Sequence, residues 1–243
     1  MKTLQLGPVL VRACGGTDGD GGGDGPSIVL SHGYGAPGDD LVALHRVIDV
    51  GRGVRWFFPE APLKVDVGPG AVGRAWWPID MAKIQLAIMT GKRRDMIDDD
   101  PPTLATAREA LAACLDALVK DHALDPARAL IGGFSQGAML STEVVLERDE
   151  ALPAFAGLVV MSGSMLAAPR WSAQIEARAR GLHVLQSHGQ ADPLIPFEAA
   201  MALHDKLRAA GAEIELVSFR GQHEIPPAVL QRLALFARAR LGT

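Results

Sequence analysis

Six short apolar segments alternate with helix-like segments over most of the chain, and this order constrains the fold more than any other feature of the sequence. The segments are rich in β-branched or large apolar residues, and the stretches between them have helical periodicity. They comprise residues 27–31, 54–58, 128–132, 158–161, 183–187 and 213–219. Strands that alternate with helices form parallel sheets covered by helices. The sequence therefore predicts an α/β fold, a mostly parallel central sheet flanked by helices on both faces.

The composition indicates one sizeable domain and excludes several classes of partner. The 243 residues are 48% apolar, which is enough for one large core, so we expect a single domain over 1–243. The net charge is -4, and the arginines are scattered among acids, which disfavours nucleic-acid binding. Cys14 and Cys114 lack C-x-x-C spacing and histidine partners, so neither a zinc site nor a disulfide framework is expected.

The N-terminal region has no sequence feature that indicates export or a membrane span. Residues 11–14 are similar to a lipoprotein cleavage site, but Arg12 interrupts the short apolar segment. No run reaches the ~18 apolar residues that span a bilayer. We expect a soluble, cytoplasmic protein without an integral membrane segment, either a monomer or a homodimer. Two extended segments at 4–6 and 9–13 precede residues 15–25, a glycine and aspartate run that we interpret as a solvated hairpin loop.

The pentapeptide Gly133-Phe134-Ser135-Gln136-Gly137 follows one of the predicted strands and precedes a helical pattern. Glycines two residues before and after a serine allow a sharp strand-to-helix turn that exposes the hydroxyl above the sheet. The N-terminus of the following helix then faces the negative charge that develops during acyl transfer. The context favours a nucleophile elbow over an ordinary glycine-rich turn.

A nucleophilic serine needs a general base and an acid that orients it, and the C-terminal half supplies both. In α/β-hydrolases these follow the serine in the order acid, then histidine. His223 lies between the last strand and the last helix, and we assign it as the base. Asp192 follows the preceding strand and is the predicted acid. His188 is a rival base, although its position at a strand end favours a loop-shaping role. His183 and His204 lie within a strand and a helix pattern, where structural histidines are usual.

Two backbone N–H groups are needed to stabilise the oxyanion of the tetrahedral intermediate. The residue after the nucleophile, Gln136, supplies the first through its main chain. The loop after the first central strand supplies the second, and we assign this role to the N–H of Tyr34. His32 lies in the same loop but precedes the serine in the chain, so we expect it to shape the loop.

Taken together, these motifs resemble the phospholipase/carboxylesterase family of α/β-hydrolases, which includes acyl-protein thioesterases and many small bacterial carboxylesterases. The resemblance rests on four segments: residues 32–41, residues 58–62, the pentapeptide, and the paired segments around Asp192 and His223. It implies a triad of Ser135, Asp192 and His223 that works without a metal or organic cofactor. It also implies that Tyr34 and Gln136 form the oxyanion hole.

The chain departs from the family pattern at two places. Ala138 replaces a second glycine after the elbow, a small change that should still allow close packing. Residues 73–80 contain Trp76-Trp77, where relatives commonly have a tryptophan followed by Phe and Asp. The resemblance therefore does not extend to substrate preference.

Residues 62–102 form an insertion without clear strand signals, which we interpret as a cap over the site. We expect Trp76, Trp77 and Met81 to line an acyl pocket, because flat aromatic and adaptable thioether surfaces suit chains of varying shape. The alternative is that these side chains belong to the core. After the insertion, five apolar residues at helical spacing predict a helix that faces the core; they are Leu104, Ala107, Leu111, Leu115 and Leu118.

The chemistry that these residues favour is hydrolysis of a carboxylic ester or thioester through an acyl-enzyme on Ser135. The expected partner is a small-molecule or lipid-like ester. The same triad is compatible with a peptidase or an acyltransferase, because the fold does not determine the acceptor. A non-catalytic binding protein is disfavoured, since such proteins usually lack a triad residue or an oxyanion glycine.

Overall fold

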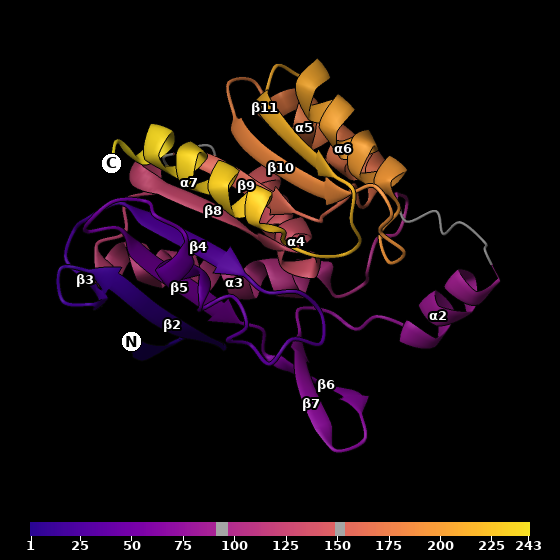
Figure 1. Cartoon of the computed structure of the whole chain (residues 1–243), viewed down its shortest axis with the longest axis horizontal. Coiled ribbons are helices and arrows are strands. Elements are labelled where there is room, and N and C mark those ends of the chain that lie inside the picture. Colours follow the sequence, from indigo (N-terminus) through magenta and orange to yellow (C-terminus); the bar gives the residue numbers. More distant parts are fainter. Residues whose placement is uncertain (91–96, 149–153) are drawn as a thin grey trace.

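The computed structural model describes residues 1–90, 97–148 and 154–243. Within them, nine strands form one sheet in the order β1-β2-β5-β4-β8-β9-β10-β11, with β3 paired to β2 (Figure 1). The strands are β1 (Lys2–Leu6), β2 (Val9–Gly16), β3 (Asp20–Gly22), β4 (Ser27–Ser31), β5 (Arg55–Glu60), β8 (Ala129–Phe134), β9 (Gly157–Met161), β10 (His183–Gly189) and β11 (Glu213–Phe219). All six segments predicted from the alternation coincide with strands of this sheet.

The sheet is mostly parallel, as predicted. Strands β5, β4, β8, β9, β10 and β11 pair with one another in parallel, in that order, whereas β2 pairs antiparallel with both β1 and β5. Because successive side chains of a strand point to opposite faces, each central strand contributes to two cores. In β8, Ile131 packs into one hydrophobic cluster and Leu130 into the other. Both side chains are fully buried, which explains why the strand has a continuous apolar sequence.

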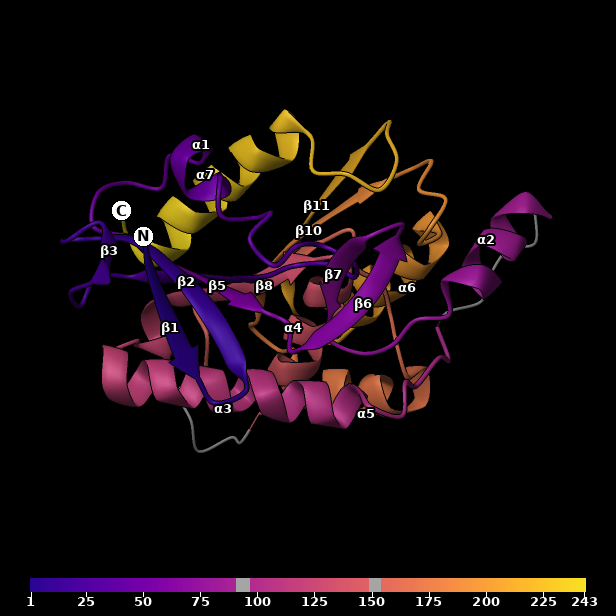
Figure 2. The same cartoon turned by 90° about the horizontal axis from the view of Figure 1, so that it is seen from below.

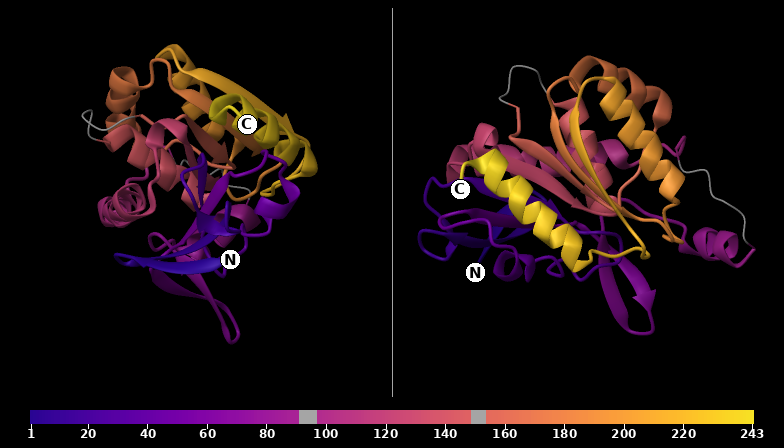
Figure 3. Two further views of the ribbon diagram at one scale, coloured as in Figure 1. Left: turned by 90° about the vertical axis from the view of Figure 1, so that its left-hand side faces the viewer. Right: turned by 45° about the horizontal axis from the view of Figure 1, so that its top comes forward.

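Helices cover both faces of the sheet, which confirms the predicted α/β fold. One face carries α3 (Leu104–His122), α4 (Gln136–Glu147), α5 (Ala168–Arg178) and α6 (Phe197–Ala209), and the opposite face carries α1 (Leu44–Val47) and α7 (Pro227–Leu241) (Figures 2 and 3). The apolar stripe predicted for α3 is buried along its whole length. Among the described residues, none of the helices has the length and apolar character needed to cross a bilayer.

The glycine-rich run at 15–25 was only partly predicted correctly. Instead of a fully solvated loop it contains strand β3, which pairs with the end of β2. The carboxylate of Asp18 accepts hydrogen bonds from the backbone N–H groups of Asp20 and Gly22, both at 2.8 Å. These side-chain contacts stabilise a short strand whose own sequence has almost no β propensity.

The insertion at 62–102 also differs from the prediction, because it begins with a β-hairpin. Strands β6 (Leu63–Gly68) and β7 (Ala71–Ala75) pair antiparallel outside the main sheet, and α2 (Met81–Met89) follows. The hairpin and α2 project from the body of the molecule (Figures 1 and 2). The side chain of Asp80 caps α2 by accepting a hydrogen bond from the N–H of Lys83 at 3.0 Å. Residues 91–96 of the insertion lie outside the described residues.

Candidate active site

Ser135 lies at the sharp turn between β8 and α4, where the sequence predicts the elbow. Its backbone has φ 54° and ψ -119°, a conformation that non-glycine residues rarely adopt. The turn is anchored on both sides: the N–H of Ser135 donates to the carbonyl of Met161 in β9 at 2.8 Å, and its own carbonyl accepts from Ala138 and Met139 in α4. Strain of this kind persists only where the surrounding structure enforces it, which is typical of a functional site.

The glycine after the elbow lets α4 approach the sheet closely. A β-carbon on Gly137 would lie 2.1 Å from the carbonyl oxygen of Ser31 in β4, far inside van der Waals contact. Only glycine fits there. The next position holds Ala138, which is completely buried, so the methyl group in place of a second glycine is accommodated.

Asp192 and His223 come from separate loops and form a short hydrogen bond. Asp192 follows β10 and His223 follows β11, and the distance from Nδ1 of the imidazole to Oδ2 of the carboxylate is 2.7 Å. The other carboxylate oxygen accepts from the N–H groups of Leu194 and Ile195, both at 2.9 Å. A proton on Nδ1 is thereby held toward the carboxylate, which leaves Nε2 as the basic nitrogen.

The electrostatic balance at Asp192 favours its ionised form. Burial acts to raise the pKa of this carboxyl. The hydrogen bond and charge of His223, together with the N–H groups of Leu194 and Ile195, outweigh burial and lower the pKa below its usual value. The carboxylate therefore remains charged at neutral pH and can stabilise a protonated imidazole.

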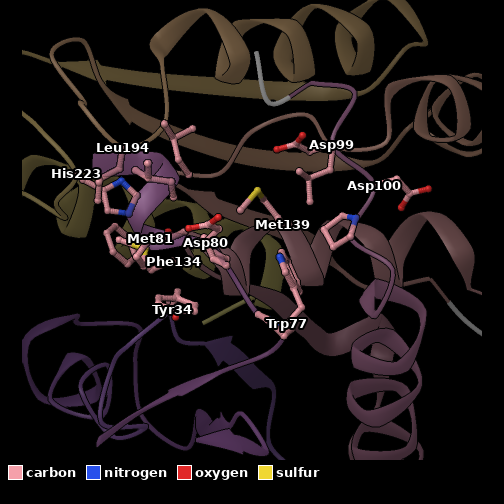
Figure 4. Close-up of a pocket in the computed structure, with 18 of the residues that line it drawn as sticks. Tyr34, Trp77, Asp80, Met81, Asp99, Asp100, Phe134, Met139, Leu194 and His223 are labelled. Carbon is pink, nitrogen blue, oxygen red and sulfur yellow. The ribbon is translucent and has the colours of Figure 1, made fainter. Parts of the chain in front are cut away.

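Ser135 and His223 both line a cavity of about 370 Å³ at the carboxyl ends of the strands (Figure 4). The ring of Phe134 lies against the imidazole of His223, with ring centroids 4.7 Å apart, and restricts its orientation. The cavity also contains Tyr34, from the loop after β4. Ligands of open α/β sheets bind in this position, outside the carboxyl ends of the strands.

The two predicted oxyanion donors lie on elements that meet beside the serine. Gln136 is the first residue of α4, where N–H groups have no acceptor within the helix. The loop that carries Tyr34 approaches from the other side: a β-carbon on the neighbouring Gly33 would lie 3.2 Å from the β-carbon of Ser135. The structure thus brings both backbone segments to the nucleophile.

Of the three predicted pocket residues, the structure places two at the cavity. Trp77 and Met81 line it, together with Ile84 of α2. Trp76 is not among the lining residues; its side chain is 2% exposed and packs in the core. The indole N–H of Trp76 donates to the carbonyl oxygen of His32 at 3.0 Å, which directs the ring inward and agrees with the core alternative.

Much of the apolar lining comes from residues that the sequence interpretation did not single out. They are Phe134, Met139, Leu166, Leu194 and Ile195. Two signals in the sequence could have identified some of them. Phe134 is next to the nucleophile, and Met139 lies one helical turn after Ser135 on the same face of α4.

Three of the other histidines, His32, His183 and His204, have contacts that account for them structurally. His32 is buried, its Nε2 accepts from the N–H of Ala61 at 2.9 Å, and its Nδ1 lies 2.7 Å from the carbonyl of Gly33, to which it donates. Burial lowers the pKa of His32 and keeps it neutral. His183 and His204 lie beside carboxylates of Glu213 and Asp205 and do not line the cavity.

His188, the rival base, is completely buried and does not line the cavity. Its Nε2 lies 2.9 Å from the carbonyl oxygen of Ile195 and 3.4 Å from Oδ2 of Asp192. Burial is the main cause that lowers the pKa of His188. A neutral His188 donates to the carbonyl of Ile195, in the segment that holds the carboxylate of Asp192, and this contact fits the loop-shaping role expected for it.

A buried ion-pair network on α4 was also missed by the sequence interpretation. Glu143 is completely buried, and both oxygens of its carboxylate accept hydrogen bonds from Arg170 at 2.9 Å. The carboxylate also accepts the indole N–H of Trp171 at 2.6 Å and pairs with Arg108 at 3.3 Å. These partners come from α3 and α5, so the network ties α4 to both neighbouring helices. A glutamate at a core position of the helix pattern was the available signal.

The described part of the chain has no group of three or more His, Cys, Asp or Glu side chains arranged to hold a metal ion.

Comparisons with known proteins identify the family. The family model described as Phospholipase/Carboxylesterase matches residues 24–241. A rice (Oryza sativa subsp. japonica) protein named as a probable carboxylesterase is 32% identical over 171 residues, which are 70% of this chain and 59% of the relative. Acyl-protein thioesterase 1 of Schizosaccharomyces pombe is 26% identical over 70% of each chain. The match thus spans about three fifths of the length of the rice protein.

A solved structure agrees with this family over nearly the whole chain. The crystal structure of esterase PE8 superposes with a TM-score of 0.75 and 27% identity, covering 95% of this chain and 98% of the other. The family match covers far more than half of the chain, and the architecture is that of the α/β-hydrolase fold. The chain therefore belongs to the phospholipase/carboxylesterase family.

Proposed function

We propose that this protein is a serine carboxylesterase or thioesterase that hydrolyses its substrate through an acyl-enzyme on Ser135. The observation that carries the proposal is the short hydrogen bond between His223 and Asp192, at 2.7 Å, beside a cavity that also contains the strained Ser135. A nucleophile on a strand-to-helix turn, a base and an orienting acid are the parts that acyl transfer needs.

In the first half of the reaction, Nε2 of His223 accepts the hydroxyl proton as Ser135 attacks the carbonyl carbon of the substrate. The imidazolium is stabilised by the carboxylate of Asp192, and it then protonates the leaving alcohol or thiol. In the second half, His223 takes a proton from water as the hydroxide attacks the acyl-enzyme, and it then returns this proton to Oγ of Ser135 as the carboxylic acid is released. Tyr34 and Gln136 donate their backbone N–H groups to the oxyanion in both halves.

The cavity favours an apolar acyl group of moderate size. Its volume of about 370 Å³ lies near the lower end of the ~300–1,000 Å³ typical of small-molecule sites. Trp77, Met81 and Met139 present aromatic and thioether surfaces to it. We propose small or lipid-like esters as the substrate class, with thioesters as the second class, because one relative is named as an acyl-protein thioesterase.

Two parallel series of substrates test this proposal. p-Nitrophenyl esters and acyl thioesters of matched chain length, from acetyl to palmitoyl, are compared by kcat/KM for the wild-type protein and Ser135→Ala. We expect measurable hydrolysis of at least one series, with an optimum at intermediate chain length and loss of turnover in Ser135→Ala. Hydrolysis that persists in Ser135→Ala, or an inert wild-type protein against both series, would refute the proposal.

A further inference from the structure

Trp76 lies between the two backbone segments that carry the proposed oxyanion donors, and it is hydrogen-bonded to both. Its indole N–H donates to the carbonyl oxygen of His32 at 3.0 Å, at the start of the loop that carries Tyr34. Its backbone N–H donates to Oε1 of Gln136 at 2.8 Å, on the first residue of α4. One residue of the insertion therefore joins the loop after β4 to the elbow.

The side chain of Gln136 completes this link. It is completely buried, and its Nε2 donates to the carbonyl oxygen of Trp77 at 2.8 Å. The amide thus uses its acceptor and one donor on two successive residues, which fixes its orientation. Gln136 has two separate parts in the site: its backbone N–H is a proposed oxyanion donor, and its side chain ties that part of the backbone to Trp76 and Trp77.

The loop that carries Tyr34 is held against β7 by two further hydrogen bonds. The N–H of Gly35 donates to the carbonyl of Arg74, and the N–H of Arg74 donates to the carbonyl of Ala36, both at 2.8 Å. The approach is so close that a β-carbon on Gly73 would lie 2.2 Å from the carbonyl oxygen of Gly35. Tyr34 therefore lies between His32, which accepts the indole N–H of Trp76, and residues 35–36, which bond to the strand that leads into Trp76.

This arrangement matters because an oxyanion hole works by preorganisation. Its two donors must both meet an oxygen that exists only in the transition state, so their spacing has to be set beforehand. The donors here come from different elements, a loop after β4 and the N-terminus of α4. A displacement of about 1 Å at a reacting centre can cost about a hundredfold in rate. A buried link between the two elements would prevent such a displacement.

We propose that Trp76 and the side chain of Gln136 form a bridge that sets the spacing of the two oxyanion donors. Both are positioning residues, since neither the indole nor the side-chain amide lines the cavity. The inference rests on the proposed function, in which the N–H groups of Tyr34 and Gln136 stabilise the oxyanion. It also gives Trp76 a role different from the pocket contact expected from the sequence.

The test compares Trp76→Phe and Gln136→Met with Trp171→Phe as the matched control. Trp76→Phe and Trp171→Phe each remove a buried indole N–H hydrogen bond, but the one at Trp171 goes to Glu143, away from the cavity. Gln136→Met keeps the backbone N–H and the length of the side chain, and it is the second variant if Trp76→Phe does not fold. Each variant is measured for Tm, for kcat and KM on a short p-nitrophenyl ester, and for inhibition by a boronic acid.

Boronic acids form a tetrahedral adduct with a nucleophilic serine, so their affinity reports on the oxyanion hole. We expect Trp76→Phe and Gln136→Met to lower kcat about tenfold and to weaken boronic acid inhibition by a similar factor, with KM within about twofold. The double variant should have a kcat only slightly lower than that of the worse single variant, because both substitutions remove the same constraint on the spacing of the donors. Trp171→Phe should lower Tm and leave kcat and inhibition within about twofold.

Two different results would overturn the inference. If the wild-type protein is active and inhibited, while folded Trp76→Phe and Gln136→Met match Trp171→Phe in kcat and inhibition, the bridge is refuted and the proposed function is not. If the wild-type protein neither hydrolyses esters nor binds the boronic acid, the proposed function fails and the bridge fails with it.

Discussion

The two sides of the cavity are built differently. On one side, Ser135, Asp192 and His223 follow strands β8, β10 and β11 directly, and hydrogen bonds to neighbouring loops or strands hold each segment. On the other side, α2 presents Met81 and Ile84 to the cavity while the rest of its apolar surface is exposed. Its exposed large apolar side chains are Leu86 (62%), Ile88 (43%) and Met89 (84%).

This difference separates two requirements of an ester hydrolase. Acyl transfer needs atoms held to within a fraction of an ångström, which the core strands and their loops can provide. An acyl group of variable shape needs an adaptable wall, and a single short helix outside the sheet suits that purpose. We therefore expect substitutions on the strand side to affect kcat or stability, and substitutions on α2 to affect the choice of chain length.

The largest effect is expected from Asp192→Asn. The N–H groups of Leu194 and Ile195 would keep the amide oxygen, so the NH2 group would face His223 and force the wrong imidazole tautomer. We expect kcat to fall by about three to four orders of magnitude. Asp205→Asn, at the His204–Asp205 pair away from the cavity, is the matched control and should stay within about twofold. Equal, small effects of both changes would show that another acid orients His223.

The next largest effect is expected from the loss of the buried charge of Glu143 on α4. Glu143→Gln would leave Arg170 and Arg108 without their buried anion, and we expect the free energy of unfolding to fall by about 3 kcal/mol. Glu147→Gln, at a more exposed carboxylate that also pairs with Arg170, should cost about 1 kcal/mol or less. Urea denaturation measures both. A Glu143→Gln protein as stable as the Glu147→Gln protein would show that the network contributes little.

Two buried histidines on the side of the cavity formed by the strands should make the free energy of unfolding depend on pH. Burial lowers the pKa values of His32 and His188 below the ordinary value of 6.5. As the pH falls below 6.5, these histidines bind protons in the unfolded chain but stay neutral in the folded protein. The free energy of unfolding is therefore highest above pH 6.5 and decreases below it. The limiting slope is about 1.4 kcal/mol per pH unit for each proton. Urea denaturation between pH 7.5 and 5 would contradict this if stability stayed constant or increased on acidification.

The smallest effect is expected on α2. Met81→Ala removes an apolar surface that lines the cavity, whereas Met89→Ala makes the same change on the same helix at a side chain that is 84% exposed. We expect Met81→Ala to lower kcat/KM about fivefold for long-chain esters and hardly at all for acetate. Met89→Ala should leave the ratio of the two unchanged. Equal losses on long and short esters would show that Met81 supports the fold and does not contact the acyl chain.

The same two sides differ in how well the sequence predicts them. The strands were predictable because segments such as 27–31 and 213–219 are apolar runs bounded by polar or glycine-rich turns, and the structure reproduces both without a shift. The proposed triad was assigned from the order in which α/β-hydrolases place their serine, acid and histidine, each in a loop after a strand. Asp192 and His223 meet because β10 and β11 are neighbours.

The insertion was not predictable in the same way. Strands β6 and β7 are largely exposed and contain Lys64, Asp66 and Gly73, so the apolar pattern that marks a strand is weak there. The place of Trp76 depends on a carbonyl 44 residues away in sequence, which no local pattern reveals. The sequence interpretation assigned both tryptophans to the pocket. Only the tertiary contacts show that Trp77 lines the cavity and that the indole of Trp76 bonds to His32.

The most direct test of the account is covalent labelling of Ser135. A fluorophosphonate reacts with an activated serine, and intact mass followed by peptide mapping locates the adduct. We expect one adduct per folded wild-type chain, on the peptide that contains Ser135, and none on Ser135→Ala. An adduct at another residue, or wild-type protein that stays unlabelled while folded, would contradict the assignment of Ser135 as the nucleophile.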